Sequence, residues 1–317
     1  MNIVICETSD SKIWNVENFV SALANASRQG AVIVDMNNEG PCLTNINFEQ
    51  IVSSISGLTI DHIRTSNQVV SSDLKEVRTA FAELELTKSK LEKFQPVVST
   101  LSHKFGIFIG RSNWFRLGLA SFLYQYYGDS TWFLYHYDNI DDYHRANFGL
   151  ETLLQKQWRM KQSVFDFVQQ LPIKSDNLSY PILWNSGALD LQQPYQSIFC
   201  EIVCETYFTG KTFMMTEKIM RPIMQRRPFV IQGPKHYLDN LRLLGFKTFD
   251  AWWNESYTQD DTDGQFSSII WTLNYIGKQS DQTLKTWYEE MQPTLEHNAQ
   301  ILSRLTNEQI MKTSFKS

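Results

Sequence analysis

Three consecutive polar residues, Thr216, Glu217 and Lys218, have the types and the order that suit binding of a charged ligand. They stand where a helix is expected to begin, with Thr216 as a good N-cap and free backbone N–H groups in the first turn that favour an anion. Lys218 could neutralise a diphosphate, and the Glu217 carboxylate could accept hydrogen bonds from ribose hydroxyls. An ordinary capped helix with a surface Glu–Lys pair would show the same residues, so the surroundings must decide.

The residues around this triplet favour a ligand site. Pro222 falls where an interior proline costs about 3 kcal/mol or kinks the helix, so the helix start is expected to be strained or late. Strained helix starts beside short loops are frequent at ligand sites. The neighbourhood is also locally basic: we expect Lys211 to help hold the ligand, and Arg226 and Arg227 to lie in solvent at the helix end.

A second candidate ligand contact is Arg111, in the segment 110–113 that joins an expected strand to an expected helix. An arginine in such a loop projects at the carboxyl edge of a parallel sheet, where α/β proteins bind ligands. It would contact a phosphate or an acceptor there, although an arginine that only braces the loop fits the same position. Arg116 lies inside the apolar helix that follows and is expected to be structural.

General-base chemistry could come from the end of the next expected strand, residues 135–138. Asp138 is the preferred base and His136 the second choice, because transfer of a group to a hydroxyl needs a base that removes the hydroxyl proton. Glu7 and Asp10, after the first expected strand, are rivals of similar standing. Hydrogen bonding within the loops would explain all four residues without catalysis.

Alternating strand and helix patterns must position these residues. The chain begins with strand, helix and strand patterns, and the alternation recurs after residues 104 and 198. Such alternation predicts an α/β fold with parallel sheets. The expected strands are residues 2–6, 31–36, 104–110, 131–136, 198–206 and 228–232, and the expected helices include 14–28, 114–127, 148–170, 217–226 and 235–244, the last capped by Gly245.

The length of 317 residues favours two domains, because a single core rarely grows that large. The segment 171–196 contains Pro172, Pro181, Gly187 and Pro194 with little periodicity, which is typical of a connection between domains. We therefore place the boundary near residue 172, with domains of residues 1–172 and 173–317. In the first domain, apolar residues between 74 and 91 keep largely three-, four- and seven-residue spacing, which predicts a long amphipathic helix.

The triplet also belongs to a longer pattern, made of residues 216–219 (TEKI), 228–231 (PFVI) and 233–234 (GP). This pattern resembles the donor-site motif of α1,3-fucosyltransferases and related glycosyltransferases. The segments 104–124 and 235–257 also resemble little-characterised glycosyltransferases that are common in bacteriophages and marine microbes. Residues 1–100 carry no such resemblance.

The resemblance implies a nucleotide-sugar-dependent glycosyltransferase with two Rossmann-like domains that face a cleft, the GT-B architecture. In the family the Glu of the motif contacts the donor ribose and the Lys contacts the diphosphate, which implies these roles for Glu217 and Lys218. The donor would bind in the second domain and the acceptor in the first. The donor is then a co-substrate, no further cofactor is expected, and the transfer is expected to be independent of metal.

The acceptor is expected to be a hydroxyl group, and the likeness to phage proteins makes hydroxymethylated pyrimidines of phage DNA one candidate. A surface polysaccharide or a protein side chain stays open, as does a binding protein of this fold without turnover. The net charge of −5 shows no whole-chain signature of nucleic-acid binding, so DNA would need a local basic surface. Residues that could contact phosphates are Lys104, Arg111 and Arg145, and those that could stack on bases are Trp114, Tyr135 and Tyr137. Packing in the core is the favoured role for each of these three aromatics.

Several other classes of protein lack their signatures here. No window has the roughly 20 apolar residues of a membrane span, and the chain passes directly into a strand, so a cytoplasmic location without membrane contact is expected. Four cysteines without a C-x-x-C pair are expected to be buried thiols. The D-x-D sequence Asp261-Thr262-Asp263 is interpreted as a helix start capped by Asp263, so no metal site is predicted. No G-x-G-x-x-G follows a strand, which argues against a dinucleotide-dependent oxidoreductase.

Overall fold

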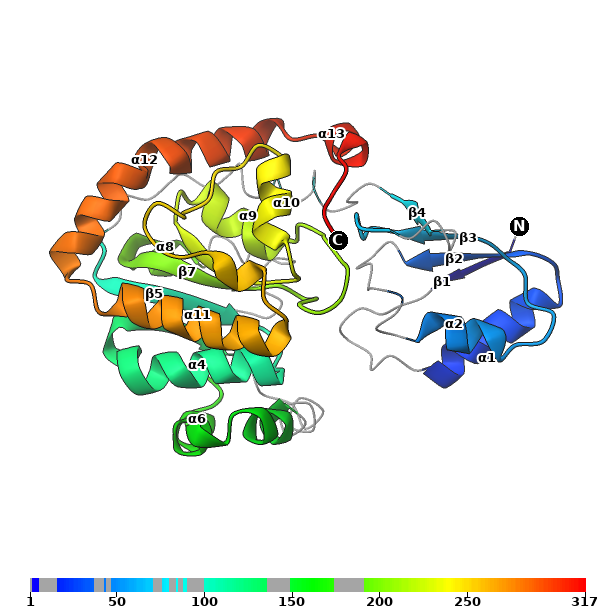
Figure 1. The fold of residues 1–317 in the computed structure, drawn as a ribbon, viewed down its shortest axis with the longest axis horizontal. Coiled ribbons are helices and arrows are strands. Elements are labelled where there is room, and N and C mark those ends of the chain that lie inside the picture. Colours follow the sequence, from blue (N-terminus) through cyan, green and yellow to red (C-terminus); the bar gives the residue numbers. More distant parts are fainter. Residues whose placement is uncertain are drawn as a thin grey trace.

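Two parallel sheets organise the chain (Figure 1). The computed structural model describes residues 2–5, 16–36, 43, 47–70, 76–79, 84, 88–89, 100–135, 149–173 and 191–317. In these residues each sheet has four strands, and every neighbouring pair of strands is parallel. The predicted α/β class with parallel sheets is therefore confirmed.

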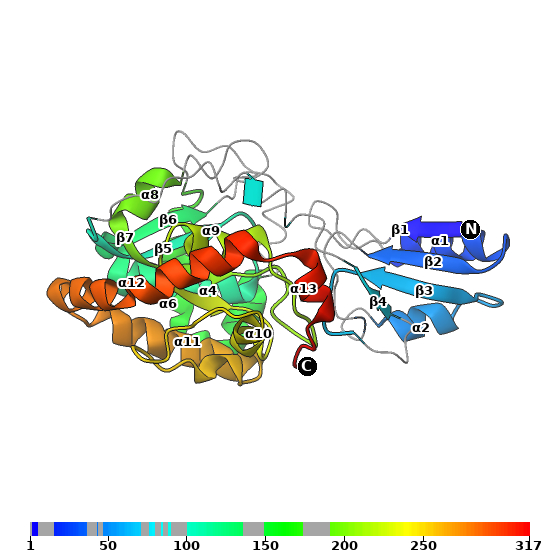
Figure 2. The same ribbon diagram turned by 90° about the horizontal axis from the view of Figure 1, so that it is seen from above.

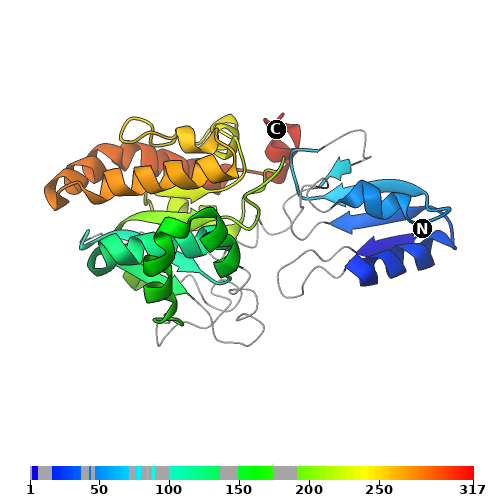
Figure 3. The same ribbon diagram turned by 60° about the horizontal axis from the view of Figure 1, so that its bottom comes forward.

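The first sheet, with its two helices, forms what we call the N-terminal lobe. Its strands lie in sequence order: β1 (Asn2–Ile5), β2 (Val32–Met36), β3 (Ile60–Thr65) and β4 (Glu76–Arg78). Helices α1 (Val16–Ser27) and α2 (Phe48–Ser53) lie on the same side of this sheet (Figures 1 and 3), as right-handed crossovers between consecutive strands require. Their apolar faces bury against β2 in a core of their own that includes Phe19, Leu23, Val32, Val34 and Phe48.

The second sheet organises the C-terminal lobe, and its strand order is β6-β5-β7-β8. These strands are β5 (His103–Ile109), β6 (Thr131–Tyr135), β7 (Ile198–Cys204) and β8 (Phe229–Gln232). Every residue of β7 is buried, as expected for a central strand of a parallel sheet that is covered on both faces. Helices α4 (Trp114–Tyr127) and α11 (Thr262–Gly277) contact each other and cover one face, while α9 (Glu217–Met224) covers the other (Figure 1).

The remaining elements surround this second sheet. Helix α12 (Asp281–Arg304) packs on α9, and it continues through Pro293 rather than being divided by it. Gly245 ends α10 with a positive φ, as its predicted capping role requires. No helix in the described ranges is both long and apolar enough to cross a membrane. The other helices are η3 (Gly128–Ser130), η4 (Trp158–Met160), α6 (Lys161–Val168), α8 (Gln192–Ser197), α10 (Tyr237–Leu243), η5 (Ser256–Thr258) and α13 (Asn307–Lys312).

The strand order of the second sheet creates a topological switch point. From β5 the chain crosses to β6 on one side, whereas β7, which pairs with the other side of β5, leads away to β8. Loops that leave β5 and β7 at their carboxyl ends therefore diverge, and such an edge is where open α/β sheets bind ligands. The strands of the first sheet follow one another without this reversal.

Two sequence predictions about the organisation differ from the structure. The boundary predicted near residue 172 falls between β6 and β7, which belong to one sheet, so the sheets divide the chain between β4 and β5 instead. Within the predicted helix of residues 74–91, Glu76–Arg78 form strand β4 at the edge of the first sheet. There pairing with β3 outweighs the helical spacing of the apolar residues, a tertiary effect that local pattern does not report.

The C-terminal residues tie the two lobes together. Arg78 of β4 donates hydrogen bonds from Nη1 to the carbonyl of Thr313 and from Nη2 to that of Met311, both at 2.7 Å. Phe315 packs on Phe213 of the C-terminal lobe, with ring centroids 4.8 Å apart. Figure 2 shows α13 and the chain end beside β4.

We expect Arg78→Ala to loosen this tie without unfolding either lobe. Each hydrogen bond from a charged donor contributes about 1.5–3 kcal/mol when well formed, less at a partly exposed site. Amide hydrogen exchange of residues 311–316 should therefore become about tenfold faster or more. Arg64→Ala is the matched control, because Arg64 lies on the neighbouring strand and is 3.9 Å from Asp35. If the amide exchange rates of residues 311–316 are equal in the two variants, Arg78 does not hold this C-terminal segment.

Candidate functional site

The predicted helix start at Thr216 is present. Thr216 is the N-cap of α9, and its hydroxyl oxygen accepts a hydrogen bond from the Lys218 N–H at 3.2 Å. Pro222 lies inside this eight-residue helix, so no N–H is available there to bond the carbonyl four residues earlier. The first N–H groups of any helix have no partner within the helix, and the Thr216 hydroxyl satisfies one of them here, so those that remain favour negative charge at this end.

A buried carboxylate fixes the cap residue itself. Glu205 follows β7, and its Oε2 accepts a hydrogen bond from the Thr216 hydroxyl at 2.6 Å. Its Oε1 accepts another from the Tyr237 hydroxyl at 2.9 Å. Burial raises the pKa of Glu205 above its usual range, although Lys218 and the bond from Thr216 oppose the shift. The start of α9 is thus anchored to the end of β7 by an acid held in the protein interior.

The guanidinium of Arg116 joins the ends of β5 and β7 at the switch point. Arg116 is buried in α4 and donates to the carbonyl of Arg111 at 3.0 Å. It also donates to the carbonyls of Cys204 and Glu205, at 3.2 and 2.8 Å. Arg116 therefore has the structural role that was predicted. Through it the Arg111 loop lies beside the segment that carries Glu205.

Glu217 and Lys218 form an ion pair at the mouth of this site. Lys218 Nζ lies 2.8 Å from Glu217 Oε1 and 3.2 Å from the Thr206 hydroxyl. The two side chains are 23% and 21% exposed, so they are less accessible than a surface pair. Burial opposes the charge of Glu217, but Lys218 and Arg221 outweigh it and hold the pKa of Glu217 below its usual range. Glu217 is therefore ionised at neutral pH.

Beneath the first turn of α9 lies a buried ionic cluster that the sequence analysis missed. Arg221 Nη2 is 2.7 Å from Glu201 Oε1, and the Tyr195 hydroxyl donates to the other oxygen of Glu201. Burial raises the pKa of Glu201, although Arg221 opposes the shift. A single acid within the otherwise apolar segment IFCEIVC was the available sequence signal, because a buried charge needs a partner.

The N-terminal lobe contacts the segment that leads into α9. Asn67, buried just after β3, donates from Nδ2 to the carbonyl of Lys211 at 3.1 Å. Its Oδ1 accepts from the Phe213 N–H at 2.9 Å, and the Gln68 N–H donates to the Phe213 carbonyl at 2.9 Å. Asn67 was not predicted as a site residue. A polar pair directly after a strand, Asn67-Gln68, was the signal for it.

The two other predicted ligand contacts, Arg111 and Lys211, lie on loops beside the start of α9. Arg111 is half-buried in the loop after β5, at the same sheet edge as Thr216. Lys211 is exposed on the segment before α9, and its backbone carbonyl accepts the hydrogen bond from Asn67. The structure thus brings together Thr216, Glu217 and Lys218, and sets Lys211 and Arg111 on the flanking loops.

The candidate bases His136 and Asp138 lie outside the described residues, as do their rivals Glu7 and Asp10. The same holds for Arg145 and Tyr137, which were considered for DNA contact.

Three residues have different roles from those predicted, namely Lys104, Arg227 and Asp263, whereas Tyr135 has the packing role that was favoured for it. Lys104 donates to the carbonyls of Gly277 and Gln279 at the opposite end of β5, so its charge is used within the fold. Tyr135 is fully buried, with its hydroxyl 2.6 Å from that of Ser112, and cannot stack on a base. Arg227 is buried against the Tyr195 carbonyl instead of lying in solvent. The N-cap of α11 is Asp261, while Asp263 pairs with Lys156.

The remaining aromatic and cysteine residues lie in or against the core of the C-terminal lobe. Trp114 packs among Phe115, Phe208 and Phe266, with the Lys156 ammonium 5.2 Å from its ring. Cys200 and Cys204 are buried free thiols, as predicted. Trp253 is buried against Phe249.

The space at this edge is small in the structure. A hollow of about 10 Å³ lies among Glu205, Tyr207, Thr212, Met214, Thr216 and Pro234. That volume holds about one water molecule. A nucleotide would therefore lie outside it, over the first turn of α9, or would displace the segment 206–215. The Gln232 side chain, in the last residue of β8, is buried without a hydrogen-bond partner among the described residues.

The arrangement can bind an anion and hydroxyl groups side by side. A helix N-terminus and an ammonium suit phosphate, and a carboxylate next to them suits ribose. Within the described ranges, no group of three or more His, Cys, Asp or Glu side chains could hold a metal ion. No protein-family model, curated protein or solved structure matches the chain.

The pKa of Glu205 predicts how stability depends on pH. Because its pKa is raised in the folded protein, ionising Glu205 costs folding free energy. The cost is absent below the pKa of the unfolded chain, about 4.3, and grows as pH rises through the folded value. Glu205→Gln removes that cost, so its stability relative to the unaltered protein should increase as pH rises above about 4.3. Chemical denaturation at a series of pH values measures this difference.

Glu296→Gln is the control with the opposite sign. The hydrogen bond from Arg226 lowers the pKa of Glu296, so its ionisation adds stability that is lost as pH falls through the folded pKa. The relative stability of Glu296→Gln should therefore decrease as pH rises. If the relative stabilities of the two variants change with pH in the same direction, Glu205 is not a carboxylate that resists ionisation.

Proposed function

We propose that the chain is a nucleotide-sugar-dependent glycosyltransferase that binds the donor diphosphate at the N-terminus of α9. The observation that carries the proposal is the position of Thr216, Glu217 and Lys218 at the carboxyl edge of the second sheet, next to its switch point. This triplet is the one that resembles the donor-site motif of α1,3-fucosyltransferases. The local sequence and the sheet topology thus independently support a donor site at the start of α9.

The ion pair between Glu217 and Lys218 gives the site a binding mechanism. An incoming phosphate takes the place of Glu217 as the partner of the Lys218 ammonium. A diphosphate brings two negative charges to Lys218 where the carboxylate brings one, and it also meets the N-terminus of α9, so the exchange favours the ligand. The released carboxylate of Glu217 can then accept hydrogen bonds from ribose hydroxyls.

The proposal extends to the two-lobed GT-B arrangement. The C-terminal lobe would bind the donor and the N-terminal lobe would face the acceptor, with Asn67 linking the acceptor side to the segment before α9. Donor binding that displaces residues 206–215 would then act directly on the contact between the lobes. Asp138 and His136 stay the proposed candidates for the general base.

The acceptor is proposed only as a hydroxyl group. Two residues considered for DNA contact are engaged within the fold: Lys104 binds carbonyls and Tyr135 is buried. The described residues therefore lend no support to a modified base in DNA, and a glycan or a protein hydroxyl is an equal candidate. A protein that binds the donor without turnover would share the site and differ only in the absence of nucleotide release.

We expect Lys218→Ala and Glu217→Ala to weaken donor binding by about tenfold or more, since each removes a charge-assisted contact. The test is a thermal-shift screen with UDP, GDP, CMP and their sugar derivatives, because a ligand that binds the native state raises the melting temperature. Without ligand, both variants should melt close to the unaltered protein, since the pair contributes about 0–1 kcal/mol.

The matched controls are Glu308→Ala and Lys312→Ala, which break another Glu–Lys pair, on the exposed surface of α13. They should leave every ligand-induced shift unchanged. If Lys218→Ala and Glu217→Ala keep the full shift with the best nucleotide, the donor site is not at α9.

We also expect EDTA to leave sugar transfer or donor hydrolysis largely unchanged. The α9 dipole and Lys218 supply positive charge at the leaving diphosphate, which is the part a divalent cation would otherwise play. The measurement is the rate of nucleotide release from the donor with and without chelator. A loss of activity that manganese or magnesium restores would refute metal independence.

A further inference from the structure

A second hollow, of about 810 Å³, lies on the C-terminal lobe between residues 250–257 and helix α11. Its size is in the range of small-molecule sites. None of its described lining residues belongs to the hollow at Thr216. Figures 1 and 3 show α11 on the outside of the lobe, next to α4.

Five aromatic rings line this hollow at two depths. Trp253 and Tyr257 are buried and form its base. Trp271 and Tyr275, one helical turn apart on α11, are 77% and 46% exposed and form the rim. Two neighbouring aromatic side chains exposed beside a concave surface are the feature of a ligand site rather than of scattered surface residues.

Residues of α12 hold two of the five rings in place, Tyr275 and Trp252. Tyr275 stacks on Trp287, with ring centroids 6.0 Å apart and planes 27° apart. Trp252, the fifth ring, donates from Nε1 to the Glu290 carboxylate at 3.1 Å. The faces of these two rings are thus oriented before any ligand arrives, which reduces the entropy lost on binding.

The polar lining is neutral or acidic. It includes the amide of Asn254 and the hydroxyls of Ser256, Ser267 and Thr272, and no Lys, Arg or His is among the described residues that line the hollow. Of its two acids, Glu255 is already paired, with Arg242 at 2.6 Å and the Phe249 N–H at 2.7 Å. Phosphates and other anions would find no cation here, so the lining favours an uncharged ligand.

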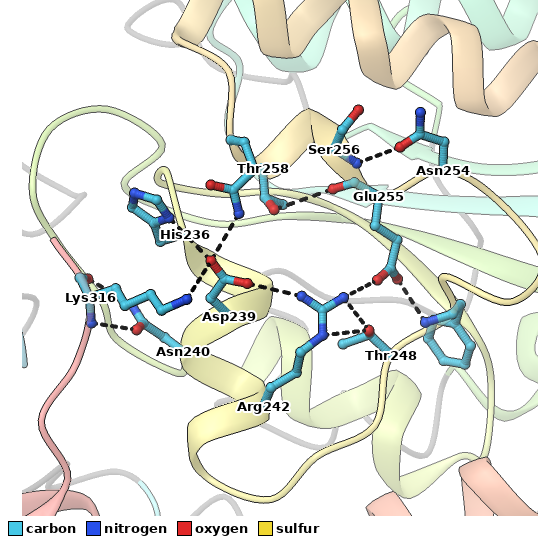
Figure 4. A network of polar contacts seen from close by, with 12 residues as sticks. His236, Asp239, Asn240, Arg242, Thr248, Asn254, Glu255, Ser256, Thr258 and Lys316 are labelled. Carbon is cyan, nitrogen blue, oxygen red and sulfur yellow. Dashed lines mark hydrogen bonds and ion pairs between the residues drawn. The ribbon is translucent and has the colours of Figure 1, made fainter.

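A network of polar contacts keeps the base of the hollow rigid (Figure 4). Arg242 of α10 pairs with Asp239 at 3.0 Å as well as with Glu255, and also donates to the Thr248 hydroxyl. Lys316 of the C-terminal tail pairs with the same Asp239 at 3.2 Å. These contacts therefore hold the loop of residues 250–257, which forms one side of the hollow, in a fixed position.

A neighbouring hollow extends the surface along α11. It measures about 490 Å³ and is lined in part by Phe122, Tyr126 and Asn274. Ser267 and Trp271 line both hollows, so the exposed indole borders each of them. A ligand that uses both sides of Trp271 must be longer than one ring-sized unit.

We propose that this face of α11 binds a neutral oligosaccharide chain, with Trp271 as the platform on which a sugar ring stacks. Sugar rings present C–H faces to aromatic rings and hydroxyls to amides, hydroxyls and carboxylates, and the lining offers these groups side by side. An apolar peptide would leave the polar lining unsatisfied, and a nucleic acid would meet one cation, Arg159 of the neighbouring hollow, and no cation among the described residues of the larger one. The proposal does not depend on the donor site at α9.

The test is to titrate the full-length protein with neutral oligosaccharides and to measure binding by tryptophan fluorescence and by calorimetry. The panel is cellohexaose, maltoheptaose, mannohexaose and chitohexaose, with hexagalacturonate and choline as charged probes. At least one neutral oligosaccharide should bind, and Trp271→Ala should weaken it by about tenfold or more, while Trp271→Tyr retains most of the affinity. Trp158→Ala is the matched control, because Trp158 is 70% exposed and lines neither hollow.

Three results would overturn the proposal. The first is that no neutral oligosaccharide binds the unaltered protein at about 10 mM, a Kd range that already represents very weak affinity. The second is equal loss of affinity in Trp158→Ala and Trp271→Ala. The third is that choline alone binds, or that the protein self-associates in a manner abolished by Trp271→Ala, which would assign the face to a cation or to a second copy. Nucleotide-induced thermal shifts should be the same in Trp271→Ala and the unaltered protein, so the outcome is separate from that at α9.

Discussion

The carboxyl ends of β5 and β7 diverge at the switch point, and the buried guanidinium of Arg116 holds them together. Strand ends leave carbonyls without ladder partners, and Arg116 satisfies three of these at once, from the Arg111, Cys204 and Glu205 residues. Glu205 then binds the hydroxyl of Thr216, which caps α9. The position of the candidate site thus depends on a series of buried polar contacts that begins on α4 and ends at a helix N-terminus.

Two acids of the β7 region fix α9 at two points. Glu201 and Glu205 are four residues apart, and both reach α9: the first pairs with Arg221 and the second with Thr216. Both carboxyls have pKa values raised by burial, so each is costly to charge and is retained with specific partners. Two polar anchors on one strand restrict both the rotation and the sliding of a short helix, whereas apolar packing alone tolerates small shifts. The geometry of the N-terminal turn is therefore set by hydrogen bonds.

Sequence reasoning succeeded where the cause was local and failed where it was not. The cap at Thr216 and the positive φ at Gly245 follow from the chemistry of neighbouring residues, and both are present. The division of the sheets did not follow, because an uninterrupted alternation of strands and helices does not reveal that β5, β6 and β7 belong to one sheet. Arg227 was assigned to solvent because its partner, the Tyr195 carbonyl, is distant in sequence. Glu205 was hidden in the same way, since only Tyr237 and Thr216 distinguish it from a surface acid.

Asn67 contacts the segment before α9 through backbone atoms: the Lys211 carbonyl and the Phe213 N–H. Hydrogen bonds to backbone atoms depend on the course of the main chain at residues 211–213 and do not depend on which side chains stand there. Exposed positions such as Lys211 can therefore accumulate substitutions during evolution without loss of the contact between the lobes. For protein engineering, the same property makes this segment suited to randomised libraries, in which Lys211 and its exposed neighbours are varied while the scaffold is kept.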